Sequence, residues 1–170
     1  MSQIDAHGLS MNVPAGWEGR IFRRNASGET RAAEVPGPAA PPGEVTMPLA
    51  HLATVPIPVD AADYGSDVVE TLGPTDVFMV LKEFAPEEAA KALFARVGLP
   101  RTIDPEAFDP GTLQRTIPGQ AGQQIFFQES GRAFCLYIVI GDFRRRTQLA
   151  APLNGVLAQM RIQPTAEVAP

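Results

Sequence analysis

The side chains that most often carry catalysis or bind metals are few in this sequence: His7, His51 and Cys135. No H-x-x-x-H or H-E-x-x-H spacing links the histidines, so the strong zinc signatures are absent. His51 stands between the apolar Ala50 and Leu52, which is typical of a hydrogen-bonded structural histidine. Cys135 lies in the most apolar stretch of the chain, where a small inert core residue is expected rather than a thiolate nucleophile.

Other motifs for chemistry are also missing. The sequence has no G-x-S-x-G nucleophile elbow, no P-loop and no G-x-G-x-x-G phosphate loop. Acidic residues gather in two clusters that lack the ligand spacing and closing glutamate of a calcium loop. These clusters are Asp60, Asp63 and Asp67, and Asp104, Glu106 and Asp109. We therefore expect no catalytic residue, no cofactor and no metal, and a protein that is not an enzyme.

Two groups of arginines are the candidate contacts to a partner. Arg144, Arg145 and Arg146 follow the most apolar stretch, and Arg23 and Arg24 follow an earlier extended segment. Because neighbouring side chains of a strand point to opposite faces, the five cannot all share one face. We predict a basic end of the sheet that contacts an acidic partner or the protein's own acidic loops.

Composition narrows the class of protein. The chain has 170 residues, a net charge of −5, and apolar residues at 45%, as in an ordinary globular domain. The acidic balance disfavours binding to nucleic acid or to anionic lipid. No apolar run approaches the ~18 residues that span a bilayer, and the N-terminus lacks the pattern of a secretory signal. We expect a cytoplasmic protein without membrane insertion, and twelve arginines against two lysines indicate a GC-rich bacterial genome.

Residues 123–146 are predicted to form the centre of the fold. Residues 124–128 and 133–140 read as two strands joined by a turn at 129–132, where Gly131 suits a left-handed position. In the second strand, apolar side chains fall on both faces, which indicates a strand inside the sheet rather than at its edge.

The remaining elements complete an α+β fold in one domain over residues 1–170. We predict a single antiparallel sheet of about six to seven strands with two to three helices packed on it. Further strands are expected at 9–13, 19–24, 45–55, 77–84, 113–117 and 161–163, and helices at 65–72, 86–97 and 148–160. The core spans about 8–163, with a mobile Pro/Gly-rich loop at about 25–43 and a frayed tail at 164–170.

Three stretches together resemble a known fold: the opening from Gly8 to Trp17, the Ser130-Gly131-Arg132 turn before a long apolar strand, and the closing helix followed by a short strand. They are similar to the PsbP-like fold, which includes the extrinsic P protein of photosystem II, a nuclear-transport factor that binds the Ran GTPase, and bacterial relatives. The resemblance implies a protein-interaction module without catalysis. No functional residue of the family matches closely enough to be carried over, and the Pro-rich loop and the 86–97 helix depart from its pattern.

Our first functional prediction is therefore a non-enzymatic interaction or accessory domain of a bacterial cytoplasmic system. The alternative is a small-ligand-binding protein or weak hydrolase, with a pocket near Trp17, His51 and the Asp60 to Asp67 loop. For Trp17, a structural role is expected ahead of ligand binding: its side chain should close one end of the core. A structural subunit of a larger assembly is a third prediction, and an edge strand near Val45 would allow a homodimer.

Overall fold

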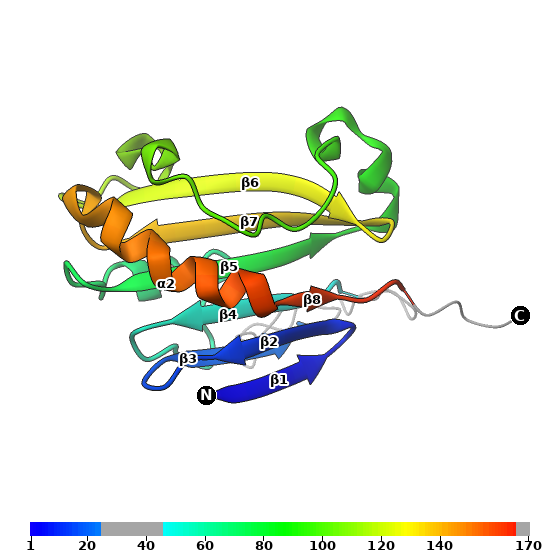
Figure 1. The fold of residues 1–170 in the computed structure, drawn as a ribbon, viewed down its shortest axis with the longest axis horizontal. Helices are drawn as coiled ribbons and strands as arrows, with labels where there is room; N and C mark the ends of the chain where they lie inside the picture. Colours follow the sequence, from blue (N-terminus) through cyan, green and yellow to red (C-terminus); the bar gives the residue numbers. More distant parts are fainter. Residues whose placement is uncertain (25–45, 166–170) are drawn as a thin grey trace, which may run out of the picture.

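The computed structural model describes residues 1–24 and 46–165, whose strands form two sheets (Figure 1). The three-stranded sheet has the order β1-β2-β8, with bounds Ser2–Ala6, Leu9–Val13 and Arg161–Ile162. The five-stranded sheet has the order β3-β4-β5-β7-β6, with bounds Glu18–Phe22, Leu49–Ala53, Val77–Phe84, Arg132–Ile140 and Ala121–Glu129. The prediction of a single sheet is wrong.

The two sheets separate where β2 meets β3. Gly19 of β3 has no side chain, and a Cβ there would lie 2.7 Å from Val13 Cγ2 and 3.2 Å from Met11 Cε. Side chains of β2 therefore pack directly onto the backbone of β3, whereas a single sheet requires the two strands to pair edge to edge. Strand β1, which the sequence pattern did not reveal, extends the three-stranded sheet on the other side of β2.

The predicted hairpin is confirmed. Strand β7 pairs with β6 on one side and β5 on the other, and it is buried at every position. Ser130 and Gly131 both have positive φ angles, 55° and 75°, as a two-residue turn of type I′ requires. The central place of β7 in its sheet follows from the apolar residues on both of its faces.

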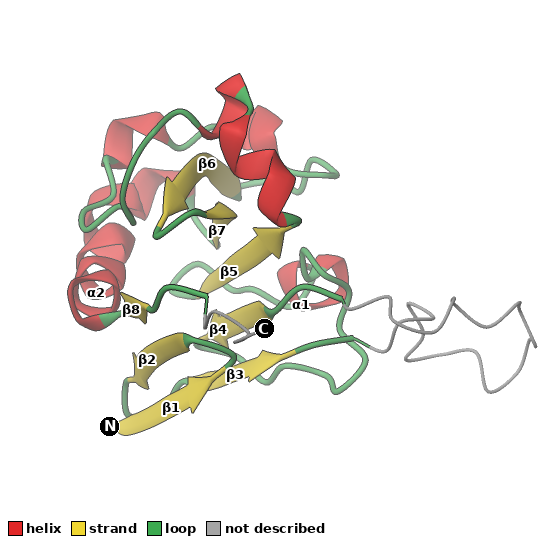
Figure 2. Cartoon of the chain, turned by 90° about the vertical axis from the view of Figure 1, so that its right-hand side faces the viewer, coloured by secondary structure: helices red, strands yellow, loops and turns green. Residues whose placement is uncertain are grey.

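Different elements pack on the two faces of the five-stranded sheet. Helix α2, Arg146–Gln159, and the three-stranded sheet pack on the face that carries Phe134, Leu136 and Ile138. The short helix α1, Ser66–Val69, and its flanking loops pack on the face that carries Cys135 and Tyr137. Figure 2 shows the two helices on opposite sides of the sheet.

Among the described residues, α2 is the only α-helix of more than four residues, so the prediction of two to three packed helices is wrong. The 86–97 segment forms two 3-10 turns, η1 Pro86–Ala90 and η2 Ala92–Phe94, separated by extended Lys91. Leu93 and Val97 are exposed there, leaving Phe94 as its buried apolar contact. A short segment without a packed apolar face does not hold an α-helix.

Several other bounds also differ from prediction. Segment 113–117 is not a strand, and α1 is shorter than the predicted 65–72 helix, with Gly65 rather than Ser66 at its N-cap. Strand β4 begins only after Pro48. The short turns η3 Pro105–Ala107, η4 Pro110–Thr112 and η5 Phe143–Arg145 complete the elements. The predicted 25–43 loop, Val45 and most of the predicted tail lie outside the described residues.

Arg132, the first residue of β7, joins the two sheets. Its Nε and Nη2 donate to the two carboxylate oxygens of Glu83 at 2.8 and 2.6 Å, and both side chains are only 5% exposed. Its Nη1 donates to the carbonyl of Gln163 at 2.7 Å and to that of Gly8 at 3.3 Å, and Nη2 donates to that of His7 at 3.1 Å. We call these contacts the Arg132 junction; the sequence marked this arginine only as a turn residue.

Candidate functional site

A hollow among the described residues lies on the α1 side of the five-stranded sheet. It has a volume of about 310 Å³ and adjoins a smaller hollow of about 170 Å³, with which it shares Tyr64, Gln114 and Tyr137. We call the pair the tyrosine cleft, because both tyrosines of the chain line it. The other lining residues are Ser66, Val69, Glu70, Thr112, Leu113, Arg115, Ile117 and Gln124.

Tyr64 and Tyr137 form the centre of the cleft. Their rings meet edge to face, with centroids 5.5 Å apart and an interplanar angle of 89°. Burial raises the pKa of Tyr64 to about 12. Burial also raises the pKa of Tyr137, although a hydrogen bond from the backbone N–H of Gln114 opposes this effect. Both phenols are therefore neutral near pH 7 and act as hydrogen-bonding groups rather than as bases.

The rest of the cleft combines an apolar lining with a charged rim. Val69, Leu113 and Ile117 belong to the hydrophobic cluster on this side of the sheet. At the rim, Arg115 forms an ion pair with Glu70, and both side chains are exposed. Such a lining suits an apolar group that is bound with few polar contacts.

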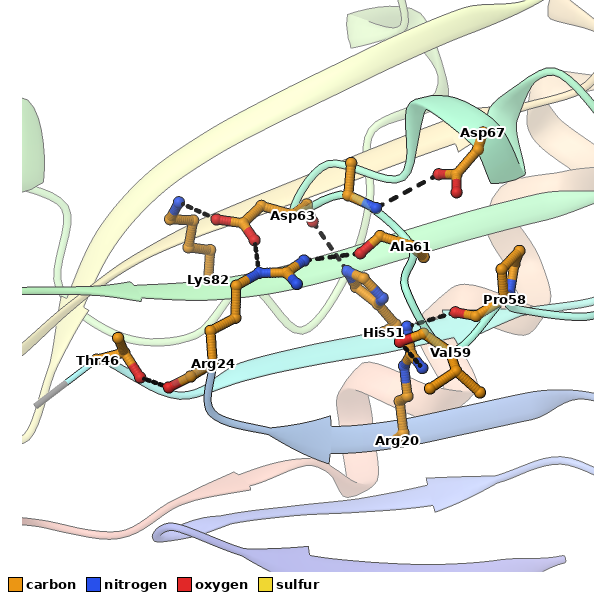
Figure 3. Close-up of polar contacts among 11 residues, drawn as sticks. Arg20, Arg24, Thr46, His51, Pro58, Val59, Ala61, Asp63, Asp67 and Lys82 are labelled. Atoms are coloured by element: carbon orange, nitrogen blue, oxygen red, sulfur yellow. Dashed lines mark hydrogen bonds and ion pairs between the residues drawn. The ribbon is translucent and has the colours of Figure 1, made fainter. Parts of the chain in front are cut away.

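A set of partly buried polar contacts holds the loop that carries Tyr64 (Figure 3). The carboxylate of Asp63 accepts hydrogen bonds from Arg24 and from Lys82, the latter at 2.7 Å. Burial alone would raise the pKa of Asp63, but the hydrogen bonds from Lys82 and Arg24 hold it below its ordinary value. Arg24 also donates to the carbonyl of Ala61 at 2.7 Å. The position of Tyr64 therefore depends on cations from β5 and from the end of β3.

Two further side chains support the same loop. Arg20 donates to the carbonyls of Pro58 at 2.8 Å and Val59 at 3.1 Å. His51 Nε2 lies 2.9 Å from the carbonyl oxygen of Asp63, and its ring lies between those of Phe22 and Phe78. The structural role predicted for His51 fits these contacts.

Acid should destabilise the fold through His51. Burial lowers its pKa from 6.5 to about 4, although the hydrogen bond to Asp63 opposes this. Between these values the unfolded chain binds the additional proton, so the free energy of unfolding falls as the pH falls. At about 1.4 kcal/mol per pKa unit, the loss between pH 6.5 and pH 4 should be roughly 3 kcal/mol. Urea unfolding at pH 7, 5.5 and 4 measures it.

The control variant is His51→Gln, which keeps an N–H donor but does not titrate. It should flatten the dependence in this window, because the lowered pKa of Asp63 places its titration at lower pH. His7→Asn, at an exposed histidine with positive φ, should retain the wild-type slope. An unchanged slope in His51→Gln would contradict the assignment.

The structure does not bring the two groups of arginines together. Strands β3 and β7 run in opposite directions, because three antiparallel pairings separate them. The residues after β3 and after β7 therefore lie at opposite ends of the sheet. A single basic end does not form, and whether either group contacts a partner stays a prediction.

Within each group the arginines differ. Arg144 is 89% exposed beside Asp142, and Arg145 is half exposed. Arg146 is partly buried: it lies over the ring of Phe143 at 4.5 Å and pairs with Glu106. At the other end Arg24 points inward to Asp63, while Arg23 lines a hollow of about 410 Å³. The charged groups of that hollow include Arg132 and Glu83, whose hydrogen bonds are already taken up within the protein.

The predicted pocket near Trp17, His51 and the Asp60 to Asp67 loop is formed only in part. Tyr64 and Ser66 of that loop line the tyrosine cleft, whereas Trp17 packs against the hydrophobic cluster on the opposite face of the sheet. His51 is fully buried. Tyr137 is a site residue that the sequence did not reveal, and it lies on the face of β7 opposite Phe134.

Within residues 1–24 and 46–165, no group of three or more histidine, cysteine or acidic side chains could hold a metal ion. The same residues contain no helix with the length and apolar character needed to cross a membrane. No family model, no curated protein and no solved structure matches the chain. The resemblance to the PsbP-like fold therefore stays a prediction.

Proposed function

We propose that this chain is a non-enzymatic recognition domain of a bacterial cytoplasmic system, which binds a partner protein by accepting an apolar side chain in the tyrosine cleft. The observation that carries the proposal is an open hollow with apolar side chains in its lining, in which the phenol of Tyr137 and the charges of the rim are already paired. Tyr137 accepts a hydrogen bond from the Gln114 backbone, and Arg115 pairs with Glu70. Anchor side chains that fill such pockets commonly dominate the affinity of protein interfaces.

The chemistry of the cleft supports recognition over catalysis. Its lining residues include no histidine, lysine or cysteine, so no imidazole or amine lines the cleft to activate Ser66, and the carboxylate of Glu70 is paired with Arg115. The cysteine beneath it, Cys135, is fully buried, and burial raises the pKa of its thiol. A cytoplasmic location is part of the proposal, supported by a single buried cysteine and an acidic composition.

Filling the cleft should strongly reduce partner capture. Gln114 is exposed and lines both hollows, so Gln114→Trp places an indole in the cleft without disturbing the core. Cross-linking of the purified chain in native extract, read by quantitative mass spectrometry, should show partner yields at least about tenfold lower for this variant. Gln3→Trp, at an exposed glutamine on β1, is the matched control and should keep the wild-type yields.

A third variant tests the predicted arginine contacts in the same experiment. Arg144→Glu combined with Arg145→Glu reverses two exposed charges at the far end of β7. Loss of the partner in this variant but not in Gln114→Trp would show that the arginines contact the partner, and it would contradict the cleft proposal. Equal yields in all four proteins would contradict both.

The second candidate is a small-ligand-binding protein. The volume of the cleft favours it, because about 310 Å³ is at the lower limit of small-molecule sites, which range over roughly 300–1,000 Å³. The size suits a single-ring compound rather than a dinucleotide. A thermal-shift panel of metabolites distinguishes the two candidates: a reproducible shift that Gln114→Trp abolishes would favour this one. No feature of the described residues favours a purely structural subunit.

A further inference from the structure

Strand β6 forms one edge of the five-stranded sheet, and other segments cover only its two ends. Near its start, Gly122 exchanges two backbone hydrogen bonds with Asp109, at 2.9 and 3.0 Å. Near its end, the N–H of Gln128 donates to the carbonyl of Arg96 at 2.8 Å, and its carbonyl accepts from Gly98 at 2.7 Å. The outer side of β6 is therefore already used for strand-like pairing at both ends.

The middle of this edge is open. Backbone groups of a strand point alternately to either side, and both Gly122 and Gln128 point outward. Gln124 and Phe126 have the same parity, so their two N–H and two C=O groups also point outward. Within residues 1–24 and 46–165, these groups have no backbone partner on the outer side. An open edge of this kind is a template for another extended chain.

The open stretch adjoins the tyrosine cleft. Gln124 lies directly opposite Tyr137 in the β6–β7 ladder, and both line the smaller hollow of the cleft. Side chains of a strand placed beside Gln124 alternate between the two faces of the sheet. One of them would therefore point toward the cleft, on the same face as Tyr137.

We propose that an extended segment of a partner protein adds to the sheet as a short strand at Gln124 and Phe126 and places one apolar or aromatic side chain in the tyrosine cleft. The inference rests on the proposed function and specifies the form of the partner. Backbone hydrogen bonds would supply affinity, and the cleft would select the side chain, as in other cases of strand addition.

The dimensions of the gap exclude a second copy of β6 as the added strand. Gly122 and Gln128 are six positions apart in the strand, or about 20 Å at ~3.4 Å per residue. Segments 96–98 and 109–112 flank the gap, so a nine-residue strand such as β6 would collide with them. A segment of about four residues, roughly 13 Å long, fits between them.

The test removes one backbone N–H on the outer side of β6 and leaves the hydrogen bonds between β6 and β7 intact. Gln124→Pro deletes an N–H that points away from β7, and proline is tolerated at such edge positions. Gln124→Thr keeps the N–H and is the matched control. A phage-displayed library of random seven-residue peptides is selected on the full chain, and binding of the enriched peptide is measured by fluorescence polarisation. We expect the affinity of Gln124→Pro to be about tenfold lower than that of Gln124→Thr, because both variants lose the glutamine side chain from the cleft lining and only the proline loses the N–H.

Hydrogen exchange of the wild-type chain provides a second measurement that does not depend on the folding of a variant. The amides of Gln124 and Phe126 should exchange rapidly in the free chain and slowly with the peptide bound, while those of Gly122 and Gln128 stay slow in both. Slow exchange of Gln124 and Phe126 in the free chain would mean that the chain or a second copy already covers the edge, and would overturn the proposal.

The variants also separate this inference from the proposed function. Equal binding to Gln124→Pro and Gln124→Thr overturns strand addition, and loss of binding in Gln114→Trp would then leave the cleft proposal standing. Loss in Gln124→Pro with no effect of Gln114→Trp supports strand addition and contradicts the cleft as anchor. Failure of the library to yield any enriched peptide overturns the inference.

Discussion

Replacing Arg132 by methionine should lower the free energy of unfolding by roughly 3–5 kcal/mol, because the change leaves the charge of Glu83 buried without its partner. Glu83 is only 5% exposed, and it receives two hydrogen bonds from this arginine. The carbonyls of Gly8 and Gln163 would lose a donor at the same time. Urea unfolding monitored by circular dichroism measures the change.

Two further variants test the cause of this loss. Arg115→Met breaks an exposed ion pair with Glu70 and should cost less than about 1 kcal/mol. Adding Glu83→Leu to Arg132→Met removes the stranded charge and should recover a large part of the loss. An Arg132→Met cost no greater than that of Arg115→Met would refute the Arg132 junction as a stabilising contact.

Gly141→Ala should cost at least about 3 kcal/mol, because no space exists for a methyl group at this position. A Cβ on Gly141 would lie 1.7 Å from the carbonyl oxygen of Gly73 and 2.7 Å from its carbonyl carbon. Both are backbone atoms, so they cannot rotate away as a side chain would. Gly141 also donates its N–H to the carbonyl of Asp76 at 2.9 Å, which holds the two turns together.

Helix α2 offers a matched control for this substitution. Gly155 lies within the helix, and a Cβ there would meet no atom within 4 Å. Gly155→Ala should therefore stabilise the protein by roughly 0.5–1 kcal/mol, through the higher helix propensity of alanine. Thermal and urea unfolding of both variants provide the comparison, and similar midpoints for the two would show that the turns at 73 and 141 are not tightly packed.

Apolar patterns within a single segment correctly predicted several strands and the long helix. The apolar residues on both faces of 133–140 predicted a strand between two others, which β7 is. The spacing of Leu149, Leu153 and Val156 predicted a helix with one face on the sheet, and α2 buries these side chains. The same reasoning failed at 86–97, where the periodic residues Leu93 and Val97 have nothing to pack against.

The tyrosine cleft could not be predicted in this way. Its residues come from three distant segments, at 64–70, 112–117 and 124–137, and no pattern within one segment shows which others will face it. The sequence also could not show which arginines are exposed and which point into the protein. Arg24 is turned inward to an aspartate 39 positions away, while Arg144, in a similar basic run, is exposed.

The sequence by itself determined which segments are strands or helices wherever a segment both carries its own apolar periodicity and has a surface to pack on, and it determined the acidic composition of the protein. Only the tertiary structure decided that the strands divide into two sheets, that Arg132 joins them, and that no other described segment pairs with the middle of β6 beside the cleft. The physical reason is that apolar periodicity shows which side chains of one element are buried and which are exposed. Which elements meet depends on contacts such as Gly19 on β2 and Arg132 on Glu83, which form between residues far apart in the chain.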